Sequence, residues 1–461
     1  MSPSFDVVVI GSGPAGEKAA MQAAKARRRV AIIDKVDRLG GNCLHTGTIP
    51  SKTLRETILY LAGARQRSLT GVQTHLDKGV KLAALMRRAG EVVRGQIEVL
   101  GRRLERNDVT LFAGNARFLD PHRIEIVEQG GARREIEAAK VLIAVGSRPA
   151  HDPAIPFDDE CVYDSDTVLG LDAIPRTLTI VGAGVIGCEY ACMFSLLGTK
   201  VTLVDARPRI LDVVDREIAE LLVARMREYG IVLRLGEEVA EVRIETSGRV
   251  VATTRSGKVL ASEKFLYAIG REGNTADLGL ERAGLTAAKR GLLTVNRHFQ
   301  TSVPHIYAAG DVIGFPSLAA TAMHQGRLAM AHALGVPVNG EGYALPYGVY
   351  TIPEVSMVGE TEEQLTQAGV SYEIGHAFFR EIARGEIVGD RTGMLKLLFE
   401  RETHRLRGVH IIGEKASELV HIGQAVLAFG GPVDYFVDTV FNFPTLSEAY
   451  KVAALNGLNR L

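Results

Sequence analysis

The chain has 461 residues, of which 46% are hydrophobic and 23% are charged. This length exceeds what one compact core supports and predicts two to four domains. Lysine plus arginine and aspartate plus glutamate both number 54, so the summed charge provides no basic field for nucleic acid or an anionic membrane. Neither a signal-peptide pattern nor an apolar run of membrane-spanning length is present. We therefore expect a cytoplasmic protein without nucleic-acid or membrane partners.

The four cysteines are too few for a disulfide framework in a chain of this length. Cys188 and Cys192 lie one helical turn apart, but they lack the further cysteine or histidine ligands of a zinc site. We expect these two and Cys161 to be packing residues, because a free cysteine often behaves as a small buried apolar group. The expected metal content is therefore none.

A glycine-rich turn follows the first apolar run, residues 5–10. Residues 17–25 are rich in alanine and predict a helix, and residues 30–33 predict a second strand that ends at an aspartate. This order is typical of dinucleotide-binding folds: the glycines let the backbone approach the pyrophosphate, the helix N-terminus stabilises its charge, and the acid accepts hydrogen bonds from the ribose. The residues that form this first site are Gly11, Gly13, Gly16 and Asp34.

Helical and antiparallel segments follow the first turn. Residues 53–107 predict long helices with mixed charges over an apolar stripe. Residues 117–136 alternate apolar and polar side chains around turn signals, which predicts an antiparallel excursion. Residues 140–145 then predict a return to a buried strand, which closes the first part of the chain.

A second glycine turn repeats the first pattern between residues 178 and 205. An apolar strand precedes it, and a helix and a second strand ending in an aspartate follow. Two such units imply two dinucleotides, one held permanently and the other exchanged. The residues that form this second site are Gly182, Gly184, Gly187 and Asp205.

The segment 40–52 resembles the redox-active segment of the flavoprotein disulfide reductases, the family of lipoamide dehydrogenase and glutathione reductase. Cys43 stands at the first cysteine position, but Thr48 stands at the second. A threonine hydroxyl cannot close a disulfide. Near the C-terminus Phe443 occupies the position of the family's acid-base histidine, and only Glu448 remains of that pair. Since a phenyl ring cannot exchange a proton, these coupled losses indicate a reaction without a dithiol.

The resemblance covers nearly the whole chain and implies a glutathione-reductase-like α/β fold. It implies two Rossmann-like dinucleotide-binding domains, one for FAD (1–149 and 271–335) and one for NAD(P) (150–270). A C-terminal α+β dimerisation domain (336–461) implies a homodimer or a higher homo-oligomer. Residues 301–311 resemble the family's second FAD motif, with Gly310 and with Asp311 on the ribityl hydroxyls. The strands and the helix expected in the last domain are 349–355, 395–400, 406–412 and 417–428.

The single cysteine followed by Thr-Ile-Pro-Ser-Lys, and the tail 448–459, are similar to those of the transhydrogenase branch of this family. This resemblance implies an FAD cofactor and NAD and NADP(H) as substrates, with NADPH + NAD+ = NADP+ + NADH through the flavin. One alternative is an NAD(P)H-dependent quinone reductase or diaphorase on the same scaffold. Another is a catalytically silent dimeric scaffold that docks into a multienzyme complex. The intact nucleotide motifs of this chain count against it, because a silent scaffold would not need them.

Three residues stand where the family has groups beside the flavin. Lys52 and Glu189 match the family's lysine and glutamate near flavin N5, which implies an ion pair that stabilises anionic reduced flavin. The alternative is a purely structural ion pair. Cys43 is expected to be a spectator near the flavin, with charge transfer or reaction with small oxidants as alternatives. The histidines that remain as possible proton carriers are His45, His324 and His421.

Coenzyme choice is expected to lie at the end of the second motif. Asp205 suits the 2′-hydroxyl of NAD and repels the 2′-phosphate of NADP, whereas Arg207 and Arg209 suit that phosphate. A site with one acid and two arginines would tolerate both coenzymes. The alternative is that both arginines are solvated surface charges.

Overall fold

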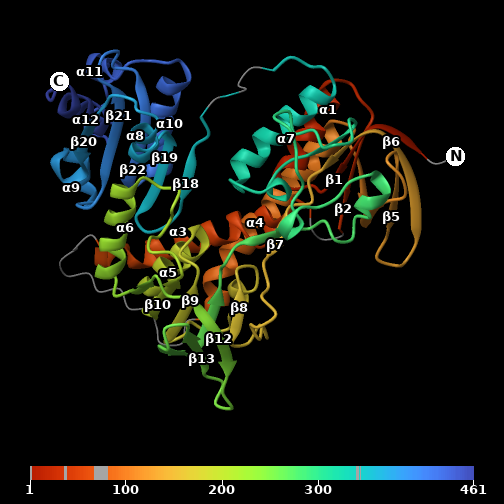
Figure 1. The fold of residues 1–461 in the computed structure, drawn as a ribbon, viewed down its shortest axis with the longest axis horizontal. Helices are drawn as coiled ribbons and strands as arrows, with labels where there is room; N and C mark the ends of the chain where they lie inside the picture. Colours follow the sequence, from red (N-terminus) through yellow and green to blue (C-terminus); the bar gives the residue numbers. More distant parts are fainter. Residues whose placement is uncertain (1–2, 36–38, 67–80, 339–341, 343) are drawn as a thin grey trace.

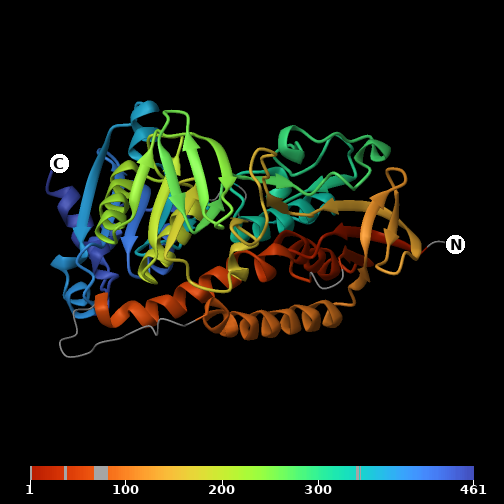
Figure 2. The same cartoon turned by 90° about the horizontal axis from the view of Figure 1, so that it is seen from below.

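The computed structural model describes residues 3–35, 39–66, 81–338, 342 and 344–461. Three sheet-containing units appear as separate lobes in Figure 1, and the same units are seen from below in Figure 2. The first unit contains a seven-stranded sheet of order β3-β2-β1-β6-β5-β4, with β17 beside β6. Its strands are β1 Ser4–Ile10, β2 Val30–Asp34, β3 Thr110–Ala113, β4 Asn115–Phe118, β5 Arg123–Val127, β6 Arg133–Ile143 and β17 Ile306–Ala308.

Strand β6 has two kinds of neighbour along its length. Its first half pairs antiparallel with β5, which confirms the predicted excursion, and its second half pairs parallel with β1. The buried strand predicted at 140–145 is the second half of β6, which ends at Ile143 and continues the hairpin without a break. Strand β17 also pairs parallel with β6, so the chain returns to the first sheet after passing through the second unit.

The second unit contains a five-stranded parallel sheet of order β11-β10-β9-β15-β8. A three-stranded antiparallel sheet, β12-β13-β14, packs beside it, and the short pair β7-β16 joins the first two units. The strands are β7 Ser147–Pro149, β8 Val162–Asp164, β9 Thr177–Val181, β10 Lys200–Asp205, β11 Val232–Leu235, β12 Val239–Ile244, β13 Val250–Thr254, β14 Val259–Ser262, β15 Lys264–Tyr267 and β16 Arg271–Gly273.

The C-terminal unit, blue in Figure 1, is an antiparallel sheet of order β18-β19-β22-β21-β20 with helices against it. The strand predicted at 349–355 is two strands of a hairpin, with residues 350–353 between them. Pro353 has no N–H for a ladder, which explains the interruption. The strands are β18 Tyr347–Val349, β19 Glu354–Gly359, β20 Tyr372–Phe378, β21 Met394–Glu400 and β22 Leu406–Gly413.

Two long helices run along one side of the molecule, red-orange and orange in Figure 2. They are α3 (Thr48–Gln66) and α4 (Leu82–Arg106), and they confirm the helical prediction for the described part of 53–107; residues 67–80 lie outside the described residues. Helix α3 begins five residues earlier than predicted, so Lys52 lies on a helix. No helix in the described ranges has the length and apolar character needed to cross a membrane.

The other helices cover the faces and ends of the sheets. They are α1 Pro14–Lys25, α2 Gly41–His45, α5 Val185–Leu196, α6 Arg216–Glu228, α7 Ala319–Ala333, α8 Glu362–Gln367, α9 Ala383–Val388, α10 Ala416–Ala428, α11 Asp434–Asp438 and α12 Glu448–Leu458. Short 3-10 turns are η1 Val168–Gly170, η2 Leu280–Ala283, η3 Lys289–Gly291, η4 Asp311–Ile313 and η5 Phe379–Glu381.

Candidate functional site

The first glycine turn lies between β1 and α1 and leaves one open position. Gly11 has φ +104°, and a Cβ there would lie 2.3 Å from the carbonyl oxygen of Ala144. A Cβ at Gly16 would lie 1.9 Å from the carbonyl oxygen of Gly11, whereas a Cβ at Gly13 would meet no atom within 4 Å. Gly11 and Gly16 are therefore needed for packing, and Gly13 leaves open space at the N-terminus of α1, the end of a helix that attracts a pyrophosphate.

The second turn, between β9 and α5, repeats this geometry. Gly182 has φ +109°, and a Cβ there would lie 2.6 Å from the carbonyl oxygen of Ala268. A Cβ at Gly187 would lie 1.8 Å from the carbonyl oxygen of Gly182, whereas Gly184 again has nothing within 4 Å. The chain thus contains two cradles of the same construction, each able to hold a dinucleotide.

Each turn is tied to the aspartate at the end of its next strand. The N–H of Ser12 donates to Asp34 Oδ2 at 2.6 Å, and the N–H of Ala183 donates to Asp205 Oδ2 at 2.5 Å. Ser12 and Ala183 both directly follow the first glycine of their turn. These hydrogen bonds hold each carboxylate beside its cradle, which is where a ribose hydroxyl of a bound dinucleotide lies.

Arg207 is bound to the acid of the second cradle. Its Nε lies 2.9 Å from Asp205 Oδ1 and its Nη2 lies 2.7 Å from Asp205 Oδ2, while Nη1 reaches Asp212 at 3.0 Å. Burial opposes ionisation of Asp205, but hydrogen bonds from the Arg207 side chain and from backbone N–H groups hold its pKa below the ordinary value. Arg209 lies apart, with Nη1 3.7 Å from Glu363. The two predicted phosphate ligands therefore have different partners.

The second FAD-like motif lies against the first cradle. A Cβ at Gly310 would lie 3.2 Å from the Cβ of Ala15 on α1. Asp311 accepts a hydrogen bond from Ser147 Oγ at 2.8 Å, and Arg271 Nε donates to the same hydroxyl oxygen at 2.8 Å. Ser147 and Arg271 were not predicted from the sequence. Their only signal is that each directly follows a glycine after a buried strand.

Cys43 lies on α2, next to the first turn. A Cβ at the neighbouring Gly41 would lie 3.1 Å from Gly13 Cα, so this helix packs against the cradle. Burial raises the pKa of the Cys43 thiol above its ordinary value, although a hydrogen bond with Thr48 opposes the shift. A raised thiol pKa disfavours the nucleophilic thiolate.

Within the described ranges, the remaining parts of the family's acid-base apparatus form no hydrogen bond with Cys43. The Phe443 side chain is 72% exposed, and Glu448 Oε2 is a buried oxygen without a hydrogen-bond partner among the described residues. His45 contacts the carbonyl oxygen of Leu39 at 3.1 Å, and His421 contacts Gln424 at 2.8 Å. These contacts connect neither histidine to the cysteine.

Lys52 and Glu189, predicted as a pair, are in contact. Lys52 Nζ on α3 donates to Glu189 Oε2 on α5 at 2.6 Å, and the two side chains are 25% and 5% exposed. The sequence did not predict the third participant, Tyr350. Its N–H donates to Glu189 Oε1 at 2.8 Å, and Lys52 Nζ lies 5.0 Å from its ring centroid. All three units of the chain therefore meet at this ion pair.

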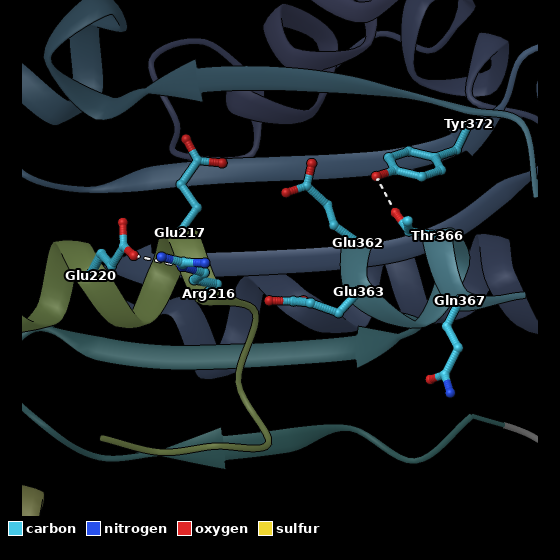
Figure 3. Close-up of a pocket in the computed structure, with 8 residues that line it drawn as sticks. All are labelled: Arg216, Glu217, Glu220, Glu362, Glu363, Thr366, Gln367 and Tyr372. Carbon is cyan, nitrogen blue, oxygen red and sulfur yellow. Dashed lines mark hydrogen bonds and ion pairs between the residues drawn. The ribbon is translucent and has the colours of Figure 1, made fainter. Parts of the chain in front are cut away.

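A separate acidic pocket of about 620 Å³ lies between α6 and α8. Figure 3 shows glutamates from both helices around it, together with the ion pair between Arg216 and Glu220 and the hydrogen bond between Thr366 and Tyr372. None of the predicted site residues lines this pocket. Its lining residues are Arg216, Glu217, Glu220, Glu362, Glu363, Thr366, Gln367 and Tyr372.

Three carboxylates beside this pocket enclose a lysine. Lys396 Nζ lies 2.9 Å from Asp215 Oδ1, 3.0 Å from Glu217 Oε2 and 2.9 Å from Glu362 Oε2. The Lys396 and Asp215 side chains have no exposed surface. Burial disfavours the ammonium, but the carboxylates raise the Lys396 pKa above its ordinary value. The cluster has the spacing of a metal site, yet the ammonium already supplies the cation.

Two glycine cradles, with an ion pair between the units that contain them, are typical of an oxidoreductase that uses two dinucleotides. Residues 5–326 match the family model described as pyridine nucleotide-disulphide oxidoreductase, and residues 345–454 match the dimerisation domain of that family. The chain therefore belongs to the pyridine nucleotide-disulphide oxidoreductase family. This membership confirms the predicted family and fold class.

Full-length relatives and solved structures agree with this assignment. The chain is 50% identical over 460 residues to a soluble pyridine nucleotide transhydrogenase of Mycobacterium tuberculosis, covering 99% of this chain and 98% of the relative. It is 45% identical to a protein of the same name from Hahella chejuensis, covering 99% of both. The structure of LpdA from Mycobacterium tuberculosis matches with a TM-score of 0.91 at 29% identity, covering 98% of this chain and 99% of that one.

Proposed function

We propose that this chain is an FAD-dependent transhydrogenase that transfers a hydride from NADPH to NAD+. The observation that carries the proposal is the pair of matching cradles with the Lys52–Glu189 ion pair between their two units, in a chain that has no second redox cysteine and no acid-base histidine at the family's positions. Full-length relatives named soluble pyridine nucleotide transhydrogenase support it. We further propose that it acts as a cytoplasmic homodimer with the domain boundaries predicted above.

The first cradle is the proposed FAD site. When bound, FAD supplies a carrier that accepts and returns two electrons as a hydride. The open position at Gly13 and the N-terminus of α1 would receive the pyrophosphate, and Asp34 would accept from the adenosine ribose. Asp311, held by Ser147, would accept from the ribityl chain. Gly11, Gly16 and Gly310 would allow the close backbone packing that brings these groups to FAD.

Lys52 is the proposed electrostatic residue of the reaction. Its ammonium would stabilise negative charge on the reduced isoalloxazine ring, and Glu189 would hold that ammonium in place. Cys43 would remain protonated beside the ring, because burial raises its thiol pKa. It is therefore proposed as a spectator.

The second cradle, with Gly182, Gly184 and Gly187, is the proposed site for both nicotinamide nucleotides in turn. Asp205 would accept from the 2′-hydroxyl of NAD(H). Arg207, now bound to that carboxylate, would turn to the 2′-phosphate of NADP(H). Arg209 would be a second phosphate ligand, because its contact with Glu363 is long, at 3.7 Å.

The test uses purified protein, NADPH as donor and thionicotinamide-NAD as acceptor, with lipoamide and oxidised glutathione as parallel acceptors. We expect bound FAD, rapid reduction of the thio-analogue and no reduction of either disulfide. Flavin reduction by NADPH without transfer to the analogue would overturn the proposal, and a quinone acceptor would then identify a quinone reductase or diaphorase. Absence of bound flavin would point to a silent scaffold.

A further inference from the structure

We propose that Tyr350 is a positioning residue that fixes the Lys52–Glu189 pair, so that the Lys52 ammonium is held between a carboxylate and an aromatic face. The inference rests on the proposed function only where it concerns the flavin. Tyr350 belongs to the C-terminal unit and directly follows β18. It therefore reaches a pair whose members come from the other two units.

The Glu189 carboxylate is bound at both oxygens. Its Oε2 accepts from Lys52 Nζ at 2.6 Å, and its Oε1 accepts from the N–H of Tyr350 at 2.8 Å. Two different donors, one on each oxygen, fix the plane of a carboxylate more tightly than the ion pair alone. Glu189 is 4% exposed, so an unpaired oxygen there would be costly.

The Tyr350 ring also lies beside the ammonium. Lys52 Nζ lies 5.0 Å from the ring centroid, within the range in which the negative face of an aromatic ring attracts a cation. The attraction is larger for a desolvated cation, and the Lys52 side chain is only 25% exposed. An aromatic ring holds the ammonium without adding a negative charge, whereas a second acid would cancel the charge that the proposed reaction needs.

The backbone directly after Tyr350 is held from α3. Arg55 Nε donates to the carbonyl oxygen of Thr351 at 3.2 Å, and Arg55 Nη2 lies 3.2 Å from Glu354. Thr351 has no exposed surface. Since Arg55 is one helical turn beyond Lys52, the same helix carries the ammonium and anchors the loop that covers it.

The contact is tested by nuclear magnetic resonance of the full-length protein with its lysines converted to [13C]dimethyl-lysine, which keeps their charge. The Lys52 signal is assigned by its loss in Lys52→Arg. We expect a ring-current shift of this signal in the wild type and in Tyr350→Phe. In Tyr350→Leu the signal should remain, but the ring-current shift should be lost. Tyr60→Leu is the matched control, because Tyr60 is on the same helix and 88% exposed. An unchanged Lys52 signal in Tyr350→Leu would overturn the inference. This readout needs neither flavin nor nicotinamide.

The consequence is tested on the flavin. In Tyr350→Leu we expect a more negative flavin midpoint potential and a kcat lower by roughly fivefold with KM nearly unchanged, corresponding to one cation–π contact. Phenylalanine analogues with increasing fluorination at position 350 keep the shape while weakening the ring face, so the potential should fall stepwise along the series. A potential that does not follow fluorination would overturn the positioning role. The midpoint potential is measured by titration with a chemical reductant. A failure of the positioning role is therefore seen separately from a failure of the transhydrogenase activity.

Discussion

At the scale of single residues, the roles proposed for Asp205 and Arg207 correspond to opposite coenzyme preferences. A free carboxylate next to a 2′-phosphate would repel it, but the Arg207 guanidinium contacts both carboxylate oxygens and neutralises that charge. Hydrogen bonds of this kind lower the Asp205 pKa against the opposing effect of burial. In the proposed roles, the ionised acid would accept from a hydroxyl, and Arg207 would have to leave Asp205 and Asp212 to bind a phosphate.

We expect Arg207→Ala to raise the KM for NADPH about tenfold or more, because the variant loses one charge-assisted contact with the phosphate. The KM for NADH should change much less, because the 2′-hydroxyl needs only the acid. Initial-rate kinetics with each coenzyme measure the difference. Arg176→Ala is the control, since this arginine of the same unit is exposed and its Nε lies 3.5 Å from Glu263. Equal losses for both coenzymes would contradict a phosphate role.

The sequence predicts some of the candidate site residues and misses others, and this difference has a physical reason. Asp205 and Arg207 were found because they occupy fixed offsets in a local motif, and Lys52 and Glu189 because a known family carries those residue types there. Their neighbour Tyr350 lies 161 positions from Glu189. Such a contact depends on how separate sheets pack, and no local pattern contains that information.

At the scale of elements, the two strand-turn-helix units allow the two nucleotides to be tested separately. Gly13 and Gly184 each face open space at an equivalent point of their turn. We expect Gly13→Ala to fold but to retain little FAD, and Gly184→Ala to retain FAD but to lose reduction by NADPH. Each added methyl group would occupy the space proposed for a pyrophosphate. Flavin absorbance and the rate of flavin reduction by NADPH measure these outcomes.

The matched controls are Gly16→Ala and Gly187→Ala. There the added Cβ would lie within 2 Å of a carbonyl oxygen, so we expect loss of folded protein rather than selective loss of a ligand. Full FAD occupancy in Gly13→Ala would show that this turn is not the flavin cradle.

The prediction of helices and strands succeeded where the sequence signal lies within one element. It was less accurate where one element continues into the next. Both glycine units were found with their strands and helices because tight turns and apolar strands have strong local signals. Strand β6 was divided in two because its exposed antiparallel half and its buried parallel half have different patterns, although hydrogen bonds continue through both. The predicted domain boundaries remain a prediction.

At the scale of the whole molecule, Lys396 connects the second unit to the C-terminal unit. Asp215 and Glu217 belong to the start of α6, while Lys396 is on β21 and Glu362 is on α8. Asp215 is also the N-cap of α6 and accepts from the N–H of Glu217 at 3.2 Å. The start of α6 is therefore fixed to the C-terminal sheet by a buried charge.

We expect Lys396→Met to lower the free energy of unfolding by about 3–5 kcal/mol, because it leaves buried Asp215 without its cation. Arg216→Met is the control: its pair with Glu220 is exposed, and such pairs contribute less than about 1 kcal/mol. Urea unfolding at neutral pH measures both. A loss for Lys396→Met as small as that of the control would show that the ion cluster does not stabilise the arrangement of the units.

The same cluster predicts how this stabilisation depends on pH. A hydrogen bond with His376, together with Lys396 and against the effect of burial, lowers the Glu217 pKa from 4.5 to about 2. A carboxyl whose pKa is lower in the folded state stabilises the protein fully above its unfolded pKa, and the effect fades as the pH falls toward the folded value. We therefore expect Glu217→Gln to be less stable than the wild type at pH 6, and the difference to shrink between pH 4.5 and pH 3. Urea unfolding of both proteins across this range measures the difference. A gap that stays constant on acidification would mean that Glu217 has an ordinary pKa in the folded protein, and a gap that widens would mean that its pKa is raised there.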